Sequence, residues 1–139
     1  MSKRNISMIG LLTLMALITG LLTAAAPLPV TTFRLVEGLP STMIVGETHT
    51  VIVQVDSDQP FISVMALPSF QFPGKGVVAV QGGDRAGSGT SASLEVTFKA
   101  KGPTTKMPNG VAPVHVVVGV RYGGGYVAVR DYLFNVTVP

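Results

Sequence analysis

The pattern of apolar and polar residues changes once along the chain, near residue 30. Residues 8–26 form a run of nineteen residues without a charge, preceded by Lys3 and Arg4. Beyond residue 30 the apolar residues instead alternate with polar ones, with the period of two that is typical of a half-buried strand. We therefore divide the chain into a hydrophobic N-terminal segment and a β-rich remainder.

The alternation predicts seven short strands, each bounded by glycine, proline or polar turn residues. They cover residues 33–37, 48–55, 61–67, 76–81, 91–101, 114–122 and 126–138. In residues 91–101, Leu94, Val96 and Phe98 share one face opposite polar neighbours, which predicts an outer strand with one wet face. Residues 114–122 carry valines on one face and Val117 and Gly119 on the other, which predicts a central strand.

The clearest turn is the run of three glycines at 123–125. A three-residue loop there would place Tyr122 opposite Tyr126 as a cross-strand aromatic pair. In the returning strand, residues 127 and 129 fit one face, while residues 132, 134, 136 and 138 fit the other. This change of phase predicts a β-bulge near Arg130 or Asp131.

Seven strands with no amphipathic helix after residue 30 predict an all-β sandwich over residues 31–139. The stretch IVGETHTVIVQV at residues 44–55 resembles the second strand of bacterial or archaeal immunoglobulin-like (fibronectin-like) extracellular modules. The resemblance continues from LEVTF at residues 94–98 through the last hairpin and covers most of residues 31–138. It implies a seven-stranded immunoglobulin-like β-sandwich used for adhesion, spacing or docking. The antibody-type disulfide and core tryptophan are absent from the sequence.

The uncharged run at residues 8–26 approaches the ~20 residues of a transmembrane helix and exceeds the ~7–15 residues of a signal-peptide core. Ala16, Gly20 and Ala24 recur every four residues and would form a small-residue face for packing against another transmembrane helix. The basic N-terminus would stay cytoplasmic, with the C-terminal domain periplasmic or extracellular. The alternative is a signal peptide within residues 1–26, cleaved after Ala25, which would release a secreted domain.

Composition narrows the remaining function classes. The sequence has no cysteine, which excludes disulfides, thiol chemistry and iron–sulfur ligation. Lys3 and Arg4 are two of ten basic residues, so eight basic residues accompany seven acidic ones in the rest of the chain. That balance gives no basis for nucleic-acid binding. Residues 27–30 are rich in proline and predict an extended spacer before the domain.

No cluster of residues predicts catalysis, a cofactor or a metal site. We expect His49 at the inner face of a strand end and His115 on the face opposite the valines of its strand. Asp56 and Asp58 are too few carboxylates for calcium, and side-chain hydrogen bonds within a turn explain them. The glycine-rich residues 82–89 lack the Lys-Ser/Thr ending and following helix of a phosphate loop, and predict a mobile inter-strand loop. The chain is therefore not expected to be an enzyme.

Phe70 and Phe72, which lie between two prolines, are the candidate partner contact. In a loop they would expose apolar area to a partner, whereas on a strand edge they would fold into the core. We expect a non-catalytic, membrane-anchored extracytoplasmic interaction module, an accessory subunit that contacts other membrane protein subunits and the lipid bilayer through residues 8–26. The alternative is a secreted module that binds polysaccharide or protein. The short first strand also predicts possible self-association through a sheet edge.

Overall fold

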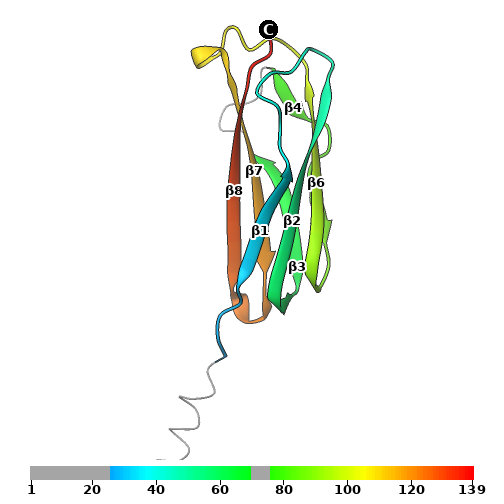
Figure 1. Cartoon of the computed structure of the whole chain (residues 1–139), viewed down its shortest axis with the longest axis vertical. Coiled ribbons are helices and arrows are strands. Elements are labelled where there is room, and N and C mark those ends of the chain that lie inside the picture. The colour runs from blue at the N-terminus through cyan, green and yellow to red at the C-terminus, as the bar shows by residue number, and fades with distance from the viewer. Residues whose placement is uncertain (1–25, 70–75) are drawn as a thin grey trace, which may run out of the picture.

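The computed structural model describes residues 26–69 and 76–139, which fold into two four-stranded antiparallel sheets (Figure 1). The first sheet has the strand order β1-β2-β6-β4, and the second has the order β5-β3-β7-β8. The strands are β1 Thr31–Glu37, β2 Thr48–Phe61, β3 Ser63–Ser69, β4 Val77–Ala79, β5 Asp84–Ala86, β6 Gly89–Ala100, β7 Ala112–Arg121 and β8 Val127–Val136. The prediction of an all-β sandwich is confirmed.

Alternate residues of the long strands point between the two sheets and form a single core. β-Branched side chains are well suited to this packing, because they fill the pleated surface without losing many rotamers. The predicted inward rows are confirmed on β6 and β7, and the same alternation gives an inward row on β2. Their residues with at most 1% exposure are Val51, Val53, Val55, Leu94, Val96, Phe98, Val114, Val116, Val118 and Val120.

The described residues contain eight strands rather than the predicted seven. The additional strand is β5, Asp84–Ala86, which lies in the glycine-rich stretch that the sequence predicts as a mobile loop and pairs with β3. Gly83 allows this approach, since a Cβ there would lie 2.9 Å from the carbonyl oxygen of Ala66 and the residue has φ +144. The polar composition of this segment does not predict a strand, because the strand depends on pairing with β3 from an earlier part of the sequence.

The predicted outer strand at residues 91–101 is also placed differently in the structure. β6 pairs with both β2 and β4, so it lies inside the first sheet. Its wet side is the outward face of the sheet, because alternation reports which face a side chain occupies and not the position of the strand within the sheet. β7, predicted as central, does lie between β3 and β8.

The expected bulge at Arg130 or Asp131 is absent from β8. Pairing with β7 runs without a register shift from Ala112 opposite Val136 to Arg121 opposite Val127. Val127 and Val129 simply point outward, with 51% and 61% exposure. The change of phase in the sequence therefore marks apolar residues on the outside of the sheet, and it does not mark an inserted residue.

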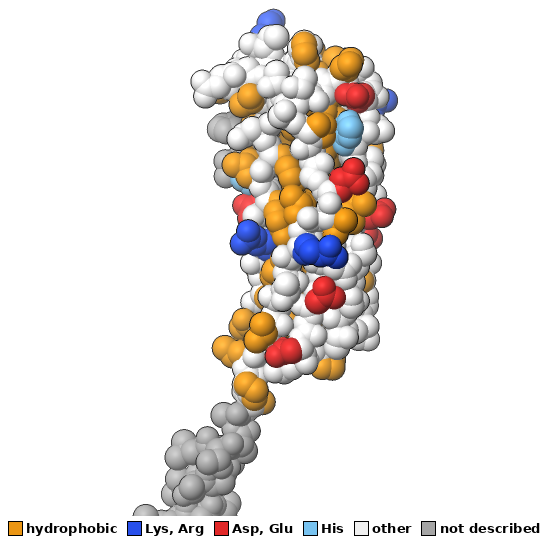
Figure 2. Space-filling view, viewed as in Figure 1, with side chains coloured by type: hydrophobic (Ala, Val, Ile, Leu, Met, Phe, Trp, Pro, Cys, Tyr) orange, Lys and Arg blue, Asp and Glu red, His pale blue; other side chains and the backbone are white. Residues whose placement is uncertain are grey.

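After β1 the chain crosses from the first sheet to the second. A parallel bridge joins Thr42 to Thr137, and the backbone N–H of Met43 donates to the carbonyl oxygen of Thr137 at 2.9 Å. Phe134 of β8 packs beside Gly38 at this crossing, where an added Cβ would lie 2.7 Å from the ring. Figure 2 shows hydrophobic side chains along the middle of this side of the molecule, flanked by charged side chains of both signs.

Residues 26–30 have no regular secondary structure and run into β1 at the end of the sandwich that carries the Gly123–Gly125 turn (Figure 1). The segment predicted as a spacer is fastened to the end of β2. The N–H of Val30 donates to Asp58 at 2.8 Å, and the Gln59 amide donates to the carbonyl oxygen of Pro27 at 2.9 Å. Within residues 26–69 and 76–139 no helix is both long and apolar enough to cross a bilayer. The hydrophobic run, with Ala16, Gly20 and Ala24, lies outside the described residues except at its last position.

The predicted aromatic pair at the last hairpin is confirmed. The Tyr122 and Tyr126 rings lie 5.7 Å apart between centroids, and the N–H of Tyr122 donates to the carbonyl oxygen of Tyr126 at 2.9 Å. Tyr122 is 3% exposed. Its hydroxyl donates to the Ser57 hydroxyl at 2.7 Å and lies 2.6 Å from the Thr31 hydroxyl. The side chain of Tyr122, the residue that follows β7, thus bonds to both β1 and β2 of the first sheet.

Replacing Tyr122 with phenylalanine is expected to lower the free energy of unfolding by about 1–2 kcal/mol, because two hydroxyls of the first sheet lose their partner while the ring stays packed. Urea unfolding of the full chain in mild detergent would measure the change. Tyr126→Phe is the matched control, since Tyr126 is 36% exposed and should change stability little. Equal effects of the two substitutions would contradict a bond between the sheets.

Candidate interaction surface

The two outward faces of the sandwich differ in chemistry. The outward positions of the first sheet are mainly polar and bond to one another across strands. The Thr50 hydroxyl lies 2.9 Å from that of Thr97, and the Gln54 amide donates to Ser91 at 2.8 Å. The outward face of the second sheet carries more apolar side chains, and we call it the aliphatic face. Its apolar side chains are Met65, Leu67, Pro113, Val117, Val127, Val129 and Leu133, and polar side chains such as His115 and Asp131 lie among them.

Much of this aliphatic area is open to solvent. Val129 is 61% exposed, Leu133 is 53% exposed and Leu67 is 38% exposed. Val129 and Leu133 lie on β8 and Leu67 lies on β3, and Val117 of the intervening β7 lies opposite Leu67. Apolar side chains that cluster on one face mark a site of interaction more often than scattered single residues do.

Strand register brings two arginines to this face. Arg85 of β5 lies opposite Met65 of β3, and Met65 lies opposite Gly119 of β7. In the next row, Ser63 of β3 lies opposite Arg121. Arg85 and Arg121 therefore stand on the two sides of β3, near the end of the sandwich where residues 26–30 enter.

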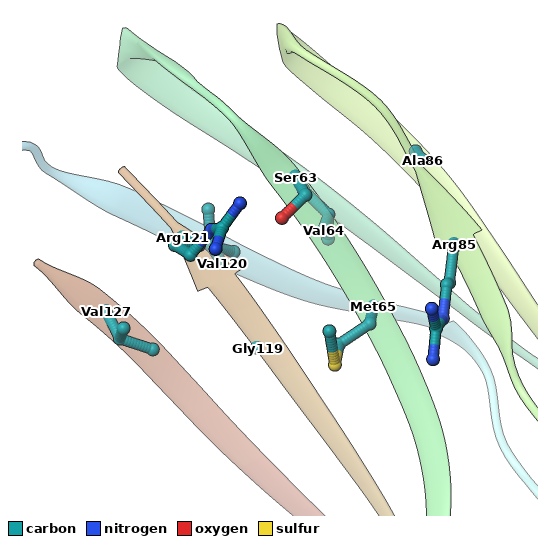
Figure 3. Close-up of a pocket in the computed structure, with 9 residues that line it drawn as sticks. All are labelled: Ser63, Val64, Met65, Arg85, Ala86, Gly119, Val120, Arg121 and Val127. Carbon is teal, nitrogen blue, oxygen red and sulfur yellow. The ribbon is translucent and has the colours of Figure 1, made fainter. Parts of the chain in front are cut away.

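A hollow of about 420 Å³ lies between these arginines, and we call it the arginine hollow. Gly119 leaves its position empty, so the sheet surface is open beside the Met65 side chain. Figure 3 shows Arg85 on one side of the hollow and Arg121 on the other, with Ser63 and Met65 between them. The floor is aliphatic and the rim carries two positive charges.

Neither guanidinium has an acidic partner within the chain. Among the described residues, the close contacts between a basic and an acidic side chain are those of His49 with Glu47, at 3.9 Å, and of His115 with Asp131, at 3.1 Å. Residues 1–25 and 70–75 contain no Asp or Glu. The arginine hollow therefore presents two positive charges without a salt bridge to a carboxylate of this chain, which favours an anionic group from outside.

His115 and Asp131 form a pair farther along the same face. The Nδ1 atom of His115 lies 3.1 Å from each carboxylate oxygen of Asp131, with the His115 side chain 14% exposed and that of Asp131 54% exposed. The sequence places His115 outward, as found, but not beside Asp131. The register of the predicted hairpin implies this contact. It sets Asp131 opposite Val117, and His115 is the neighbouring outward position on β7.

The other residues considered from the sequence do not come together. His49 lies on β2 in the first sheet, whereas His115 is on β7 in the second. Asp56 accepts a hydrogen bond from the Ser91 hydroxyl, and Asp58 accepts one from the N–H of Val30. Both aspartates lie within β2, which continues through the predicted turn. In the part of the chain that the structure describes, no three His, Asp or Glu side chains gather where they could hold a metal.

The candidate contact residues Phe70 and Phe72 lie outside the described residues, so that prediction stays open. The sequence pattern does not predict a shared site for Arg85, Arg121, Met65 and Gly119, because these residues lie in three different segments. Only strand register brings them together.

No known protein family matches the sequence, and no curated protein matches it either. Among solved structures, the chain is similar to the native conformation of E. coli alpha-2-macroglobulin determined by cryo-EM. The TM-score is 0.45 at 15% sequence identity, and the match covers 83% of this chain and 7% of that chain. The chain therefore spans a small part of the length of the protein it matches.

Proposed function

We propose that this chain is a non-catalytic, membrane-anchored interaction module on the extracytoplasmic side, an accessory subunit that docks on other membrane protein subunits. The observation that carries the proposal is the contrast between the two outward faces. On one face, polar side chains form hydrogen bonds with one another, as Thr50 does with Thr97. The other exposes Val129, Leu133 and Leu67, and the same face carries two arginines without acidic partners.

We also infer that the sandwich is immunoglobulin-like. In the seven-stranded form of that fold, strands A, B, E and D make one sheet and strands C, F and G make the other. The order β1-β2-β6-β4 corresponds to the first set and β3-β7-β8 to the second. β5 is then an extra strand added to the outer edge of β3. Folds of this kind serve many functions, so the argument for docking depends on the aliphatic face and not on the fold.

The membrane-anchored reading draws further support from the N-terminal sequence. Residues 8–26 carry no charge and follow two basic residues, which favours a span with its N-terminus in the cytoplasm. Residues 26–30 enter the domain at the end where Arg121 and Val127 flank the glycine turn (Figure 1). In an anchored protein the arginine hollow would therefore lie near the membrane, within reach of the extracytoplasmic surface of a membrane-embedded partner.

Extraction of native membranes with mild detergent, followed by size analysis, tests this proposal. We expect the chain to migrate as part of an assembly much larger than itself. The chain alone should have its intact mass of 14.5 kDa, which includes the hydrophobic segment. A species of that mass migrating alone would contradict an accessory subunit. Loss of residues 1–25 from the mass would instead favour the secreted binding module.

A substitution on each outward face makes the test specific to the proposed surface. Val129→Lys places a charge within the aliphatic face at a position that is 61% exposed, so folding should be kept while co-purification of the partner falls. Ser93→Lys is the matched control, because Ser93 is exposed on β6 in the first sheet. Loss of the partner with both variants, or with neither, would count against docking through the aliphatic face.

A further inference from the structure

We infer, on the basis of the proposed function, that the arginine hollow is the specificity site of the docking surface and binds a carboxylate side chain of the partner protein. That carboxylate would be presented within an aliphatic surface of the partner. Arg85 and Arg121 would hold the carboxylate, and Met65 with Val127 and Val129 would contact the aliphatic residues around it.

The spacing of the two arginines fits one shared anionic group. Arg85 and Arg121 are separated by two strand spacings across the sheet and by one row along it. With strands ~4.8 Å apart and ~3.4 Å per residue, their Cα atoms lie about 12 Å from each other. Two extended arginine side chains reach a common point over that distance, and the empty position at Gly119 leaves room for it.

Chemistry selects a carboxylate for this position. A guanidinium presents its N–H groups as a planar fork that matches the two oxygens of a carboxylate, and it is less strongly hydrated than an ammonium group. Arginine and methionine are both enriched in the cores of protein interfaces, where surrounding aliphatic contacts exclude water and strengthen the central charged pair. The flexible thioether of Met65 at the floor suits contact with side chains of varied shape.

Two features of the same face favour a protein over other anionic partners. Among the described residues, no Phe, Tyr or Trp occupies an outward position of β3, β5, β7 or β8, so the face lacks the usual platform for stacking sugar rings. Asp131, 54% exposed, adds a negative charge to the face, which opposes flat contact with an anionic bilayer. A partner protein can place its own carboxylate over the arginines and avoid Asp131.

Titration with a defined peptide tests the inference directly. The probe is acetyl-Val-Glu-Val-Glu-Val-amide, added to the full chain in mild detergent and followed by NMR through the methyl groups of Met65, Val127 and Val129. The control peptide replaces both glutamates with glutamine. We expect the glutamate peptide to bind about fivefold or more tightly than the glutamine peptide, with the preference lost at high salt.

Variants of the chain assign the preference to the arginines. The double variant R85Q/R121Q should abolish the difference between the peptides. R34Q, which removes an exposed arginine from β1 in the other sheet, should retain it. All three arginines are exposed, and their substitution should leave thermal unfolding unchanged. Equal binding of both peptides to the unsubstituted chain, or a preference that survives in R85Q/R121Q, would overturn the inference.

Two further measurements distinguish a carboxylate of a partner protein from other sources of an anionic group. Binding to vesicles that contain phosphatidylglycerol, lost in R85Q/R121Q without any peptide preference, would overturn the inference in favour of lipid. Dimerisation in sedimentation, lost in the same variant without peptide preference, would overturn it in favour of a second copy. The proposed function is judged separately by co-purification from native membranes. If the unsubstituted chain migrates alone there, the proposed function fails whatever the peptide result.

Discussion

Replacing Phe98 with alanine is expected to lower the free energy of unfolding by about 3–5 kcal/mol, the usual cost of deleting a fully buried aromatic ring. Phe98 has no exposed area and lies in β6, between His49 of β2 and Ala79 of β4 in the first sheet. Its ring belongs to the core between the two sheets. The loss of buried apolar area and the remaining cavity both favour the unfolded chain. The total free energy of unfolding of a domain of this size is only about 5–15 kcal/mol.

Urea unfolding of the full chain in mild detergent would measure this change through the midpoint, with an unaltered slope showing that the unfolded state is the same. Phe98→Leu is the matched control and should cost clearly less, because most of the volume is kept. A loss below about 1 kcal/mol for the alanine variant would mean that the neighbouring strands close around the cavity.

The sequence could predict Phe98 as a core residue because the relevant signal is local. Leu94, Val96 and Phe98 alternate with polar residues, and a period of two defines two faces without reference to any other strand. The hairpin at the three glycines is local in the same way, since the turn itself fixes the register of β7 and β8. For these reasons the inward rows and the Tyr122–Tyr126 pair agree with the structure.

The errors share a different cause. β5 has only three residues, and its stability depends on pairing with β3. The outward valines of β8 look like a slipped register only if every outward face is assumed to be polar. To predict either feature, one must know how the strands of the second sheet are arranged and that its outward face carries aliphatic side chains. No local sequence pattern gives this information.

The candidate site could not be predicted from the sequence for the same reason. Arg85, Met65 and Arg121 come from segments far apart in the chain, and only the order β5-β3-β7 makes them neighbours. The absence of acidic partners is also a tertiary fact, because the chain has nearly as many acidic as basic residues after its N-terminal segment. The sequence indicated an interaction module, but the surface that would serve it depends on strand pairing.

The second large effect is expected at Thr104, the one buried polar side chain among the described residues, with no exposed area. Thr104 fastens the connection between β6 and β7 to the C-terminal residues. Its hydroxyl donates to the carbonyl oxygen of Gly110 at 2.6 Å and accepts a hydrogen bond from the N–H of Val138 at 2.9 Å. The N–H of Thr104 donates to the carbonyl oxygen of Val138 at 2.8 Å.

Thr104→Val keeps the shape of the side chain and removes only the hydroxyl. It leaves the N–H of Val138 buried without a partner, since Val138 has no exposed area. An orphaned buried donor together with the lost bond to Gly110 should lower the free energy of unfolding by about 2–3 kcal/mol. Urea unfolding would measure the loss, and faster amide exchange at Val138 would localise it.

Thr105→Val is the matched control, because it is the same substitution at the next residue, where the side chain is exposed. It should change the unfolding midpoint little. If the two valine variants are equally stable, the Thr104 hydroxyl does not hold the connection to the C-terminal residues, and the link depends on the backbone bond between Thr104 and Val138 alone.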